Sequence, residues 1–150
     1  MTTPSQRLAE LGLELPPVAV PLAAYVPATR VGNLIWTSGQ LPTRDGTLLE
    51  DGIVGRSVSP EVAAELARVA ALNALAAAAQ VAGGLDQIAR VVKVVVFVAS
   101  DPAFVSQAQV ANGASMLLQE VFSSGHARSA VGVAVLPLNA PVEVEIVVEV

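Results

Sequence analysis

Val91-Val92-Lys93-Val94-Val95-Val96-Phe97-Val98 is a run of mostly β-branched residues, which predicts a β-strand. Valine occupies every even position, and the odd positions carry Val91, Lys93, Val95 and Phe97. Both faces of this strand are therefore largely apolar, as in a strand that is covered on both sides. The sheet to which the strand belongs needs a cover for each of its faces.

One helix is predicted before this strand and one after it. The letters SPE at 59–61 combine an N-cap serine, a proline at the first helical position and an acid in the first turn, and GG at 83–84 ends that helix. DP at 101–102 repeats the cap and the proline, so a second helix is predicted to start there and to stop at SSG, 123–125. Two helices can cover one face of the sheet.

Two strands are predicted before the first helix and two after the second. The runs at about 24–29 and 34–38 surround the dipeptide Gly32-Asn33, which is a two-residue hairpin signal. The runs at about 128–135 and 142–150 follow the second helix, with a proline-containing turn between them. The segment 39–58 is polar and rich in turn residues, and it is interpreted as a loop region.

The last strand places a row of carboxylates on one face of the sheet. Its alternation turns valine and isoleucine toward the helices, and turns Glu143, Glu145, Val147 and Glu149 to the other face. A solvated sheet face is a sufficient interpretation of Glu145 and Glu149. If the last two strands pair antiparallel, Arg128 lies beyond the far end of the final strand from Glu143. These two residues then share a site only if the site is assembled between subunits.

The domain organisation follows from these elements. Residues 1–21 are predicted to form an N-terminal arm, with a short helix at about 5–11 capped by Ser5 and an extended, proline-containing segment after it. Residues 22–150 form one α+β domain in the order β-β-α-β-α-β-β, with both helices on one face. No segment is left to cover the second, apolar face, so we expect another copy of the protein to cover it.

Composition excludes several classes of function. The chain has 150 residues, no cysteine and one histidine, which excludes disulfides, zinc fingers, iron–sulfur clusters and thiol nucleophiles and argues against a His-rich metal site. A net charge of −5 with only 3% aromatic residues argues against nucleic acid as a partner. With neither a signal peptide nor an unbroken apolar stretch of about 20 residues, we expect a cytoplasmic protein that makes no contact with a membrane.

The hairpin and the C-terminal strands resemble a known family. YVPATRVGNLIWTSGQLP at 25–42, together with ARSAV at 127–131, LP at 136–137 and VEVE at 142–145, is similar to the Rid family, the RidA-like or YjgF-type proteins. The resemblance implies a chorismate-mutase-like α+β fold and a homotrimer with clefts between subunits. It also implies hydrolysis of reactive enamines and imines, such as 2-aminoacrylate, to 2-keto acids and ammonia without a cofactor. Some members carry an endoribonuclease (L-PSP) or translation-inhibitor name.

The same resemblance implies roles for particular residues. Arg128 corresponds to the arginine that grips the substrate carboxylate, for which its planar fork suits a bidentate pair. Glu143 corresponds to the residue that orients the attacking water or exchanges protons with it. Tyr25 would close the cleft from a neighbouring subunit. The alternatives are a structural ion pair at the subunit interface for Arg128 and a packing aromatic for Tyr25.

Further positions would line the cleft, and two of them depart from the family pattern. Ser38, Gly39 and Asn112 match lining residues, although a strand-ending turn explains the first two and a polar helix surface explains Asn112. Many family members have cysteine where this chain has Ala130. His126 precedes the presumed site, either as a substrate contact or as a loop residue. These departures suggest a branch whose substrate need not be 2-aminoacrylate.

Two hypotheses for the function follow. One is an imine or enamine deaminase, and the other is a non-catalytic trimer that binds a small carboxylate ligand or acts by protein contact. A module that only binds carboxylates needs only the arginine, so the presence of both Arg128 and Glu143 favours the enzyme. The acidic charge and the single lysine, Lys93, disfavour a ribonuclease.

Overall fold

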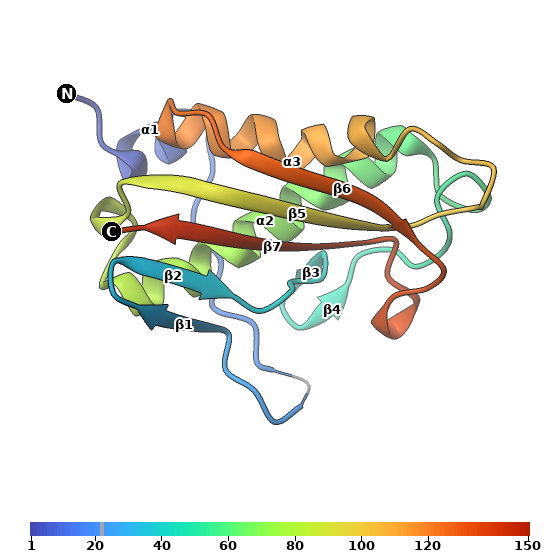
Figure 1. Cartoon of the computed structure of the whole chain (residues 1–150), viewed down its shortest axis with the longest axis horizontal. Coiled ribbons are helices and arrows are strands. Elements are labelled where there is room, and N and C mark those ends of the chain that lie inside the picture. Colours follow the sequence, from blue (N-terminus) through green and yellow to red (C-terminus); the bar gives the residue numbers. More distant parts are fainter. Residues whose placement is uncertain (22) are drawn as a thin grey trace.

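A five-stranded sheet with helices on one face forms the centre of the computed structural model, which describes residues 1–21 and 23–150 (Figure 1). The strands β1 (Ala28–Val31), β2 (Leu34–Thr37), β5 (Arg90–Ala99), β6 (Ala127–Val133) and β7 (Val142–Glu149) lie in the order β1-β2-β7-β5-β6. The helices are α1 (Pro4–Glu10), α2 (Pro60–Ala82) and α3 (Gln107–Phe122), with 3-10 turns η1 (Leu85–Gln87) and η2 (Pro137–Asn139). A two-stranded hairpin, β3 (Thr43–Arg44) and β4 (Thr47–Leu48), lies within the predicted loop region. The predicted α+β class is confirmed.

The long helix α2 has the predicted ends. Ser59 Oγ accepts a hydrogen bond from the backbone N–H of Val62 at 3.2 Å, and Gly83 ends the helix in the left-handed conformation at φ 88°. By length and composition α2 is a helix that could cross a membrane, which the sequence analysis did not find. However, 67% of its most apolar window is buried inside the fold, where α2 packs beneath the sheet and against α3.

Helix α3 begins later than predicted. It starts at Gln107 with Ser106 as N-cap, whereas Asp101 caps only a turn. The Oδ1 of Asp101 accepts from the N–H of Ala103 at 2.8 Å, and its Oδ2 pairs with Arg56 of the preceding loop. The Asp-Pro signature therefore closes a turn that ties two loops together, because the carboxylate has a long-range partner that the sequence does not reveal.

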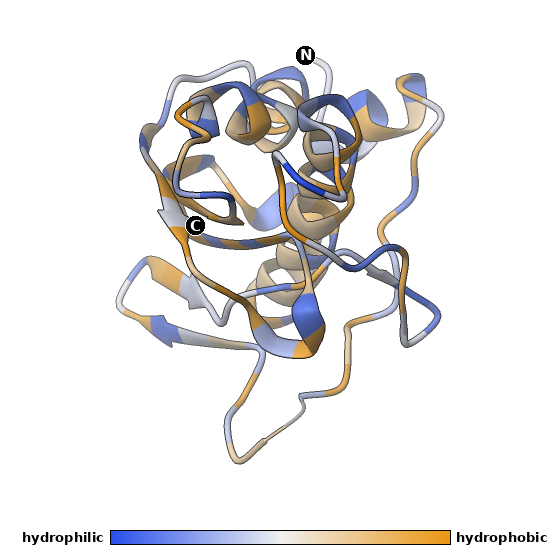
Figure 2. Cartoon of the chain, turned by 90° about the vertical axis from the view of Figure 1, so that its right-hand side faces the viewer, coloured by the Kyte–Doolittle hydropathy of each residue, from blue (hydrophilic) through white to orange (hydrophobic). Residues whose placement is uncertain are grey.

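The N-terminal arm packs on the domain. Thr3, not the predicted Ser5, caps α1, and Gln6 completes a capping box with it. Ser5 instead donates its N–H and its hydroxyl to Asp86 at 2.8 and 2.7 Å, and Leu8 is only 3% exposed. The extended segment after α1 runs along the helix side of the molecule (Figure 2).

The pairing of the last two strands differs from the prediction. β6 pairs in parallel with β5, and β7 pairs antiparallel with the opposite edge of β5, so β5 separates β6 from β7. The connection from β5 through α3 to β6 is a crossover, which makes the two strands parallel. The turn at 136–141 then carries the chain past the end of β5 to its other side.

The hairpin β1–β2 forms around Gly32-Asn33 as predicted, but β1 is shorter than expected at its start. Pro27 ends the ladder because proline has no N–H to donate, and only its carbonyl accepts, from the N–H of Ser38 at 2.8 Å. The residues before Pro27 therefore leave the sheet and form the loop that carries Tyr25.

One face of the sheet carries the helices and the other is open. In β7 the residues Val142, Val144, Ile146 and Val148 are buried and the glutamates alternate with them, as the pattern predicted. The open face, which we define by Val31, Trp36, Phe97, Val131 and Val147, carries these apolar side chains beside Lys93 and the glutamates of β7, and it is uncovered in a single chain. Trp36 is 51% exposed and Val31 is 68% exposed.

Candidate functional site

Arg128 is held by two side chains of α3. It lies on β6 opposite Val94, on the helix face of the sheet, and its Nη1 donates to Asn112 Oδ1 at 2.7 Å and to Ser115 Oγ at 3.2 Å. Within the described residues, Nε and Nη2 donate to no protein acceptor. One edge of the guanidinium fork is therefore oriented while the other remains available for a bidentate acceptor such as a carboxylate.

His126 completes this group, which we call the arginine cluster: Arg128, Asn112, Ser115 and His126. Its Nε2 lies 3.0 Å from Ser115 Oγ, the same hydroxyl that accepts from Arg128. Burial lowers the pKa of His126, and the positive charge of Arg128 lowers that pKa further. His126 is therefore neutral at physiological pH, and its ring adds no second positive charge beside the arginine.

Glu143 rests against a residue that has no side chain. A Cβ built on Gly39 would lie 1.8 Å from Glu143 Oε1, so only glycine lets the carboxylate approach the backbone this closely. Burial raises the pKa of Glu143, and the charge of the neighbouring Glu145 raises it further. Glu143 forms no salt bridge within the described residues, so nothing there offsets this rise. The arrangement is that of a carboxyl group suited to exchange protons.

Ser38 and Tyr25 belong to the same side of the molecule as Gly39. The hydroxyl of Ser38 donates to the carbonyl oxygen of Val26 at 2.6 Å, and this bond fixes the loop that carries Tyr25. The Tyr25 ring is 46% exposed and free to contact a ligand or a partner. We call Tyr25, Ser38, Gly39 and Glu143 the carboxylate cluster.

A single chain does not bring the two clusters together. Arg128 lies level with Val94 and Ile146, whereas Glu143 lies opposite Phe97, three residues further along. They are two strands apart, roughly 10 Å, and another 10 Å or so apart along the strands. Arg128 also faces the helices, while Glu143 is on the open face.

Two further residues, Ala130 on β6 and Ser115 on α3, lie near Arg128. Ala130 lies two residues after Arg128 on the same face of β6 and packs against the core. Ser115 was missed by the sequence reasoning, which treated it as part of an apolar helix stripe. Its spacing of three residues from Asn112 is the signal that pairs them on one side of α3. Residues 1–21 and 23–150 contain no group of three metal-binding side chains.

Comparisons with known proteins identify one protein family and a relative that matches almost the whole chain. A family model described as "YjgF/chorismate_mutase-like, putative endoribonuclease" matches residues 5–150. Protein TCP17 of Trypanosoma cruzi is 43% identical over 145 residues, which cover 95% of this chain and 91% of that protein.

Solved structures agree with this placement. Atu1372 of Agrobacterium tumefaciens, a protein of unknown function, is 45% identical with a TM-score of 0.88, covering 99% of this chain and 92% of its own. A "putative endoribonuclease" from Shewanella oneidensis is 34% identical with a TM-score of 0.94 and 99% coverage of both chains. RidA from an Antarctic Psychrobacter is 26% identical, with a TM-score of 0.62 and coverage of 89% of this chain and 94% of its own. The chain is thus more similar in shape to the first two structures than to this RidA.

Proposed function

The chain belongs to the YjgF/chorismate-mutase-like family, and from this membership we propose that it is a cofactor-independent hydrolase that deaminates small enamines and imines to 2-keto acids and ammonia. The observation that carries the proposal is the half-free guanidinium of Arg128, oriented by Asn112 and Ser115. It is the kind of site that binds the carboxylate of an imino acid, because both oxygens can accept from the free edge.

Glu143 is the proposed proton carrier. Protonation of the enamine carbon, or of the imine nitrogen, gives the iminium ion, and as a carboxylate Glu143 accepts a proton from the water that attacks the iminium carbon, which gives a neutral carbinolamine. The protonated carboxyl then passes this proton to the amino group, which leaves as ammonia while the C=O bond of the keto acid forms, and the carboxylate accepts the remaining hydroxyl proton. The raised pKa supports this double role, because a carboxyl group whose pKa lies closer to the working pH both takes and gives the proton more readily.

We further propose that the site forms between subunits of a homotrimer. The arginine cluster and the carboxylate cluster lie on opposite faces of the sheet and are too far apart in one chain for a small substrate. Arg128 lies on the edge strand β6, so a neighbouring copy that packs on the open face and around this edge can bring its carboxylate cluster beside the arginine cluster. Tyr25, on an exposed loop, then contacts the ligand from the neighbouring subunit.

The test measures the rate at which pyruvate forms from 2-aminoacrylate. A dehydratase in the same reaction mixture generates the 2-aminoacrylate. We expect the protein to accelerate the formation of pyruvate above the uncatalysed rate. Arg128→Lys keeps the charge but loses the fork, so the affinity for pyruvate should fall by about 1.5–3 kcal/mol, roughly ten- to a hundredfold. Arg30→Lys is the matched control, because Arg30 is exposed and bonds only to its own hairpin turn.

Glu143→Gln tests the proton carrier separately. It should leave pyruvate binding unchanged and lower turnover by about 10²–10⁴-fold. Glu145→Gln, on the same strand and face, should retain most of the turnover. If the wild type binds pyruvate but does not accelerate the formation of pyruvate from 2-aminoacrylate, the protein is a carboxylate-binding module instead.

A further inference from the structure

A groove beneath the N-terminal arm takes no part in the proton transfers proposed above. One cavity of about 540 Å³ lies between α1, the arm and α2, and a second of about 720 Å³ continues along the arm. The two cavities adjoin, and we call them together the groove. They share five lining residues: Glu14, Pro16, Thr43, Arg44 and Asn73. Each volume is in the range of small-molecule pockets, about 300–1,000 Å³.

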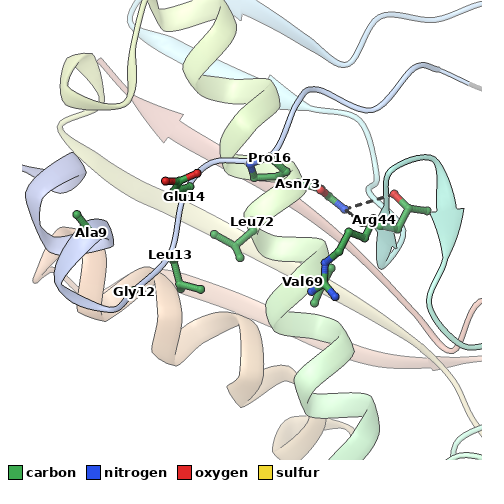
Figure 3. Close-up of a pocket in the computed structure, with 10 residues that line it drawn as sticks. Ala9, Gly12, Leu13, Glu14, Pro16, Arg44, Val69, Leu72 and Asn73 are labelled. Carbon is green, nitrogen blue, oxygen red and sulfur yellow. Dashed lines mark hydrogen bonds between the residues drawn. The ribbon is translucent and has the colours of Figure 1, made fainter.

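Asn73 is the polar group of this groove. It projects from the middle of α2, between Pro16 of the arm and Arg44 of β3 (Figure 3), and is only 4% exposed. Its Nδ2 donates to the carbonyl oxygens of Leu41 and Thr43, both at 3.0 Å, which fixes the orientation of the amide. Its Oδ1 accepts no hydrogen bond from any described residue, and Asn73 lines both cavities.

This oxygen is not sealed off from solvent, and it is free to accept a hydrogen bond from a ligand in the groove that carries an N–H or O–H donor. The walls around it are apolar and come mostly from Leu15, Val18, Ala19 and the prolines of the arm. Glu14, Asp45 and Arg44 at the rim leave no net positive charge for an anion. The groove therefore suits an uncharged, apolar group with one hydrogen-bond donor, such as a hydroxyphenyl ring.

The groove also reaches the carboxylate cluster. Tyr25 and Gly39 line its far end, and the carboxylate of Glu143, which lines neither cavity, occupies the space that a side chain at Gly39 would need. Resting on the proposed function, we infer that the groove holds the side chain of the substrate, and that the substrate is an imine or enamine of a 2-keto acid with a bulky, hydroxylated aromatic side chain. The small 2-aminoacrylate leaves this space unfilled.

The experiment measures the binding of three keto acids and one fragment by calorimetry. We expect 4-hydroxyphenylpyruvate to bind more tightly than phenylpyruvate by about three- to tenfold, the worth of one neutral hydrogen bond, and both to bind more tightly than pyruvate. p-Cresol, which is the hydroxylated side chain without the keto acid, should bind by itself. Equal affinities for 4-hydroxyphenylpyruvate and pyruvate overturn the inference.

Two variants separate this inference from the proposed function. Ala19→Trp fills the groove, and should abolish p-cresol binding and the preference for aromatic keto acids while pyruvate still binds. Ala103→Trp is the matched control, because Ala103 is exposed and lines neither cavity. Arg128→Lys should weaken the binding of all three keto acids and leave the binding of p-cresol unchanged.

The measurements distinguish a failure of the groove inference from a failure of the proposed carboxylate site. If Ala19→Trp leaves the aromatic preference intact, the groove does not hold the side chain, and the proposed function stands. If Arg128→Lys leaves the keto acids unaffected, the carboxylate site is wrong, whatever the groove does. Failure of the wild type to bind p-cresol overturns the groove as a ligand site.

Discussion

The contact between Gly39 and Glu143 determines both the position and the pKa of the Glu143 carboxylate. The carboxylate occupies the space that a side chain at Gly39 would need. The pair explains how a glutamate on an open sheet face becomes half-buried and acquires a raised pKa.

Gly39→Ala should push the carboxylate of Glu143 out of its position. The new methyl group overlaps Oε1, and the glutamate side chain is flexible enough to move aside, so we expect reduced turnover with a loss of only about 1 kcal/mol in the free energy of unfolding. Urea denaturation measures the loss of stability. In the double variant with Glu143→Ala the overlap is gone, and most of the stability should return. A Gly39→Ala protein as stable and active as the wild type would show that the contact has no consequence.

Glu143→Gln should make the protein more stable at neutral pH. The folded chain holds the Glu143 proton more tightly than the unfolded chain, so the stability of the wild type falls as the pH rises from the ordinary value of 4.5 through the raised pKa. Thermal melts should therefore show a higher Tm for the variant at about pH 7, and no difference at about pH 3.5. Glu65→Gln, at an exposed position of α2, measures the effect of losing a surface charge alone. A variant that melts below the wild type at neutral pH would contradict the sign of the shift.

At the scale of elements, the crossing of α2 and α3 depends on a second glycine. A Cβ on Gly113 of α3 would lie 1.8 Å from the carbonyl oxygen of Ala64 on α2. The many buried alanines of α2 allow the same close approach along its length. Glycine inside a helix costs about 1 kcal/mol relative to alanine, and here the close contact between helix backbones explains its presence.

Gly113→Ala should therefore destabilise the fold despite the better helix propensity of alanine. Overpacking against the α2 backbone should cost about 1–3 kcal/mol, which exceeds the gain of up to about 1 kcal/mol from propensity. Gly125→Ala, where the new methyl group meets open space, should be close to neutral. Chemical denaturation of both variants decides the matter, and a stabilised Gly113→Ala would show that the helices separate easily.

At the scale of the whole molecule, the open face is the dominant feature. Trp36, Val31 and Val131 are 51%, 68% and 42% exposed on the same face of the sheet. Exposed apolar patches of this kind mark interaction surfaces. The proposed homotrimer would cover them and bring the two clusters together.

Light scattering should give a mass of about 46 kDa, three times the chain mass of 15.3 kDa. Trp36→Glu places a charge on the open face, and should yield a folded monomer without deaminase activity, because the side chain is half exposed and supports no core in the single chain. Val62→Glu, at an exposed apolar position of α2, should remain trimeric and active. A wild-type protein that is a stable monomer at micromolar concentration would refute the intersubunit site.

The local elements could be predicted from the sequence, because their signals lie within a few residues. The cap at Ser59, the left-handed Gly83 and the period of two in β7 each depend on neighbours in the chain, and the structure has them where the patterns predicted. The family motifs likewise identified Arg128 and Glu143 as candidates without any knowledge of distance.

Features that depend on segments far apart in the chain could not be predicted without the three-dimensional fold. Asp101 closes a turn because Arg56, 45 residues away, pairs with it, so α3 starts later than its cap signal suggests. β6 lies on the other side of β5 from β7 because the helix crossover makes it parallel, which no alternation pattern encodes. Ser115, the close contact of Gly39 with Glu143, and the groove beneath the arm arise for the same reason. The hydrophobic periodicity of the sequence predicts on which face of its element a side chain lies, whereas the residues that it contacts depend on how the elements pack.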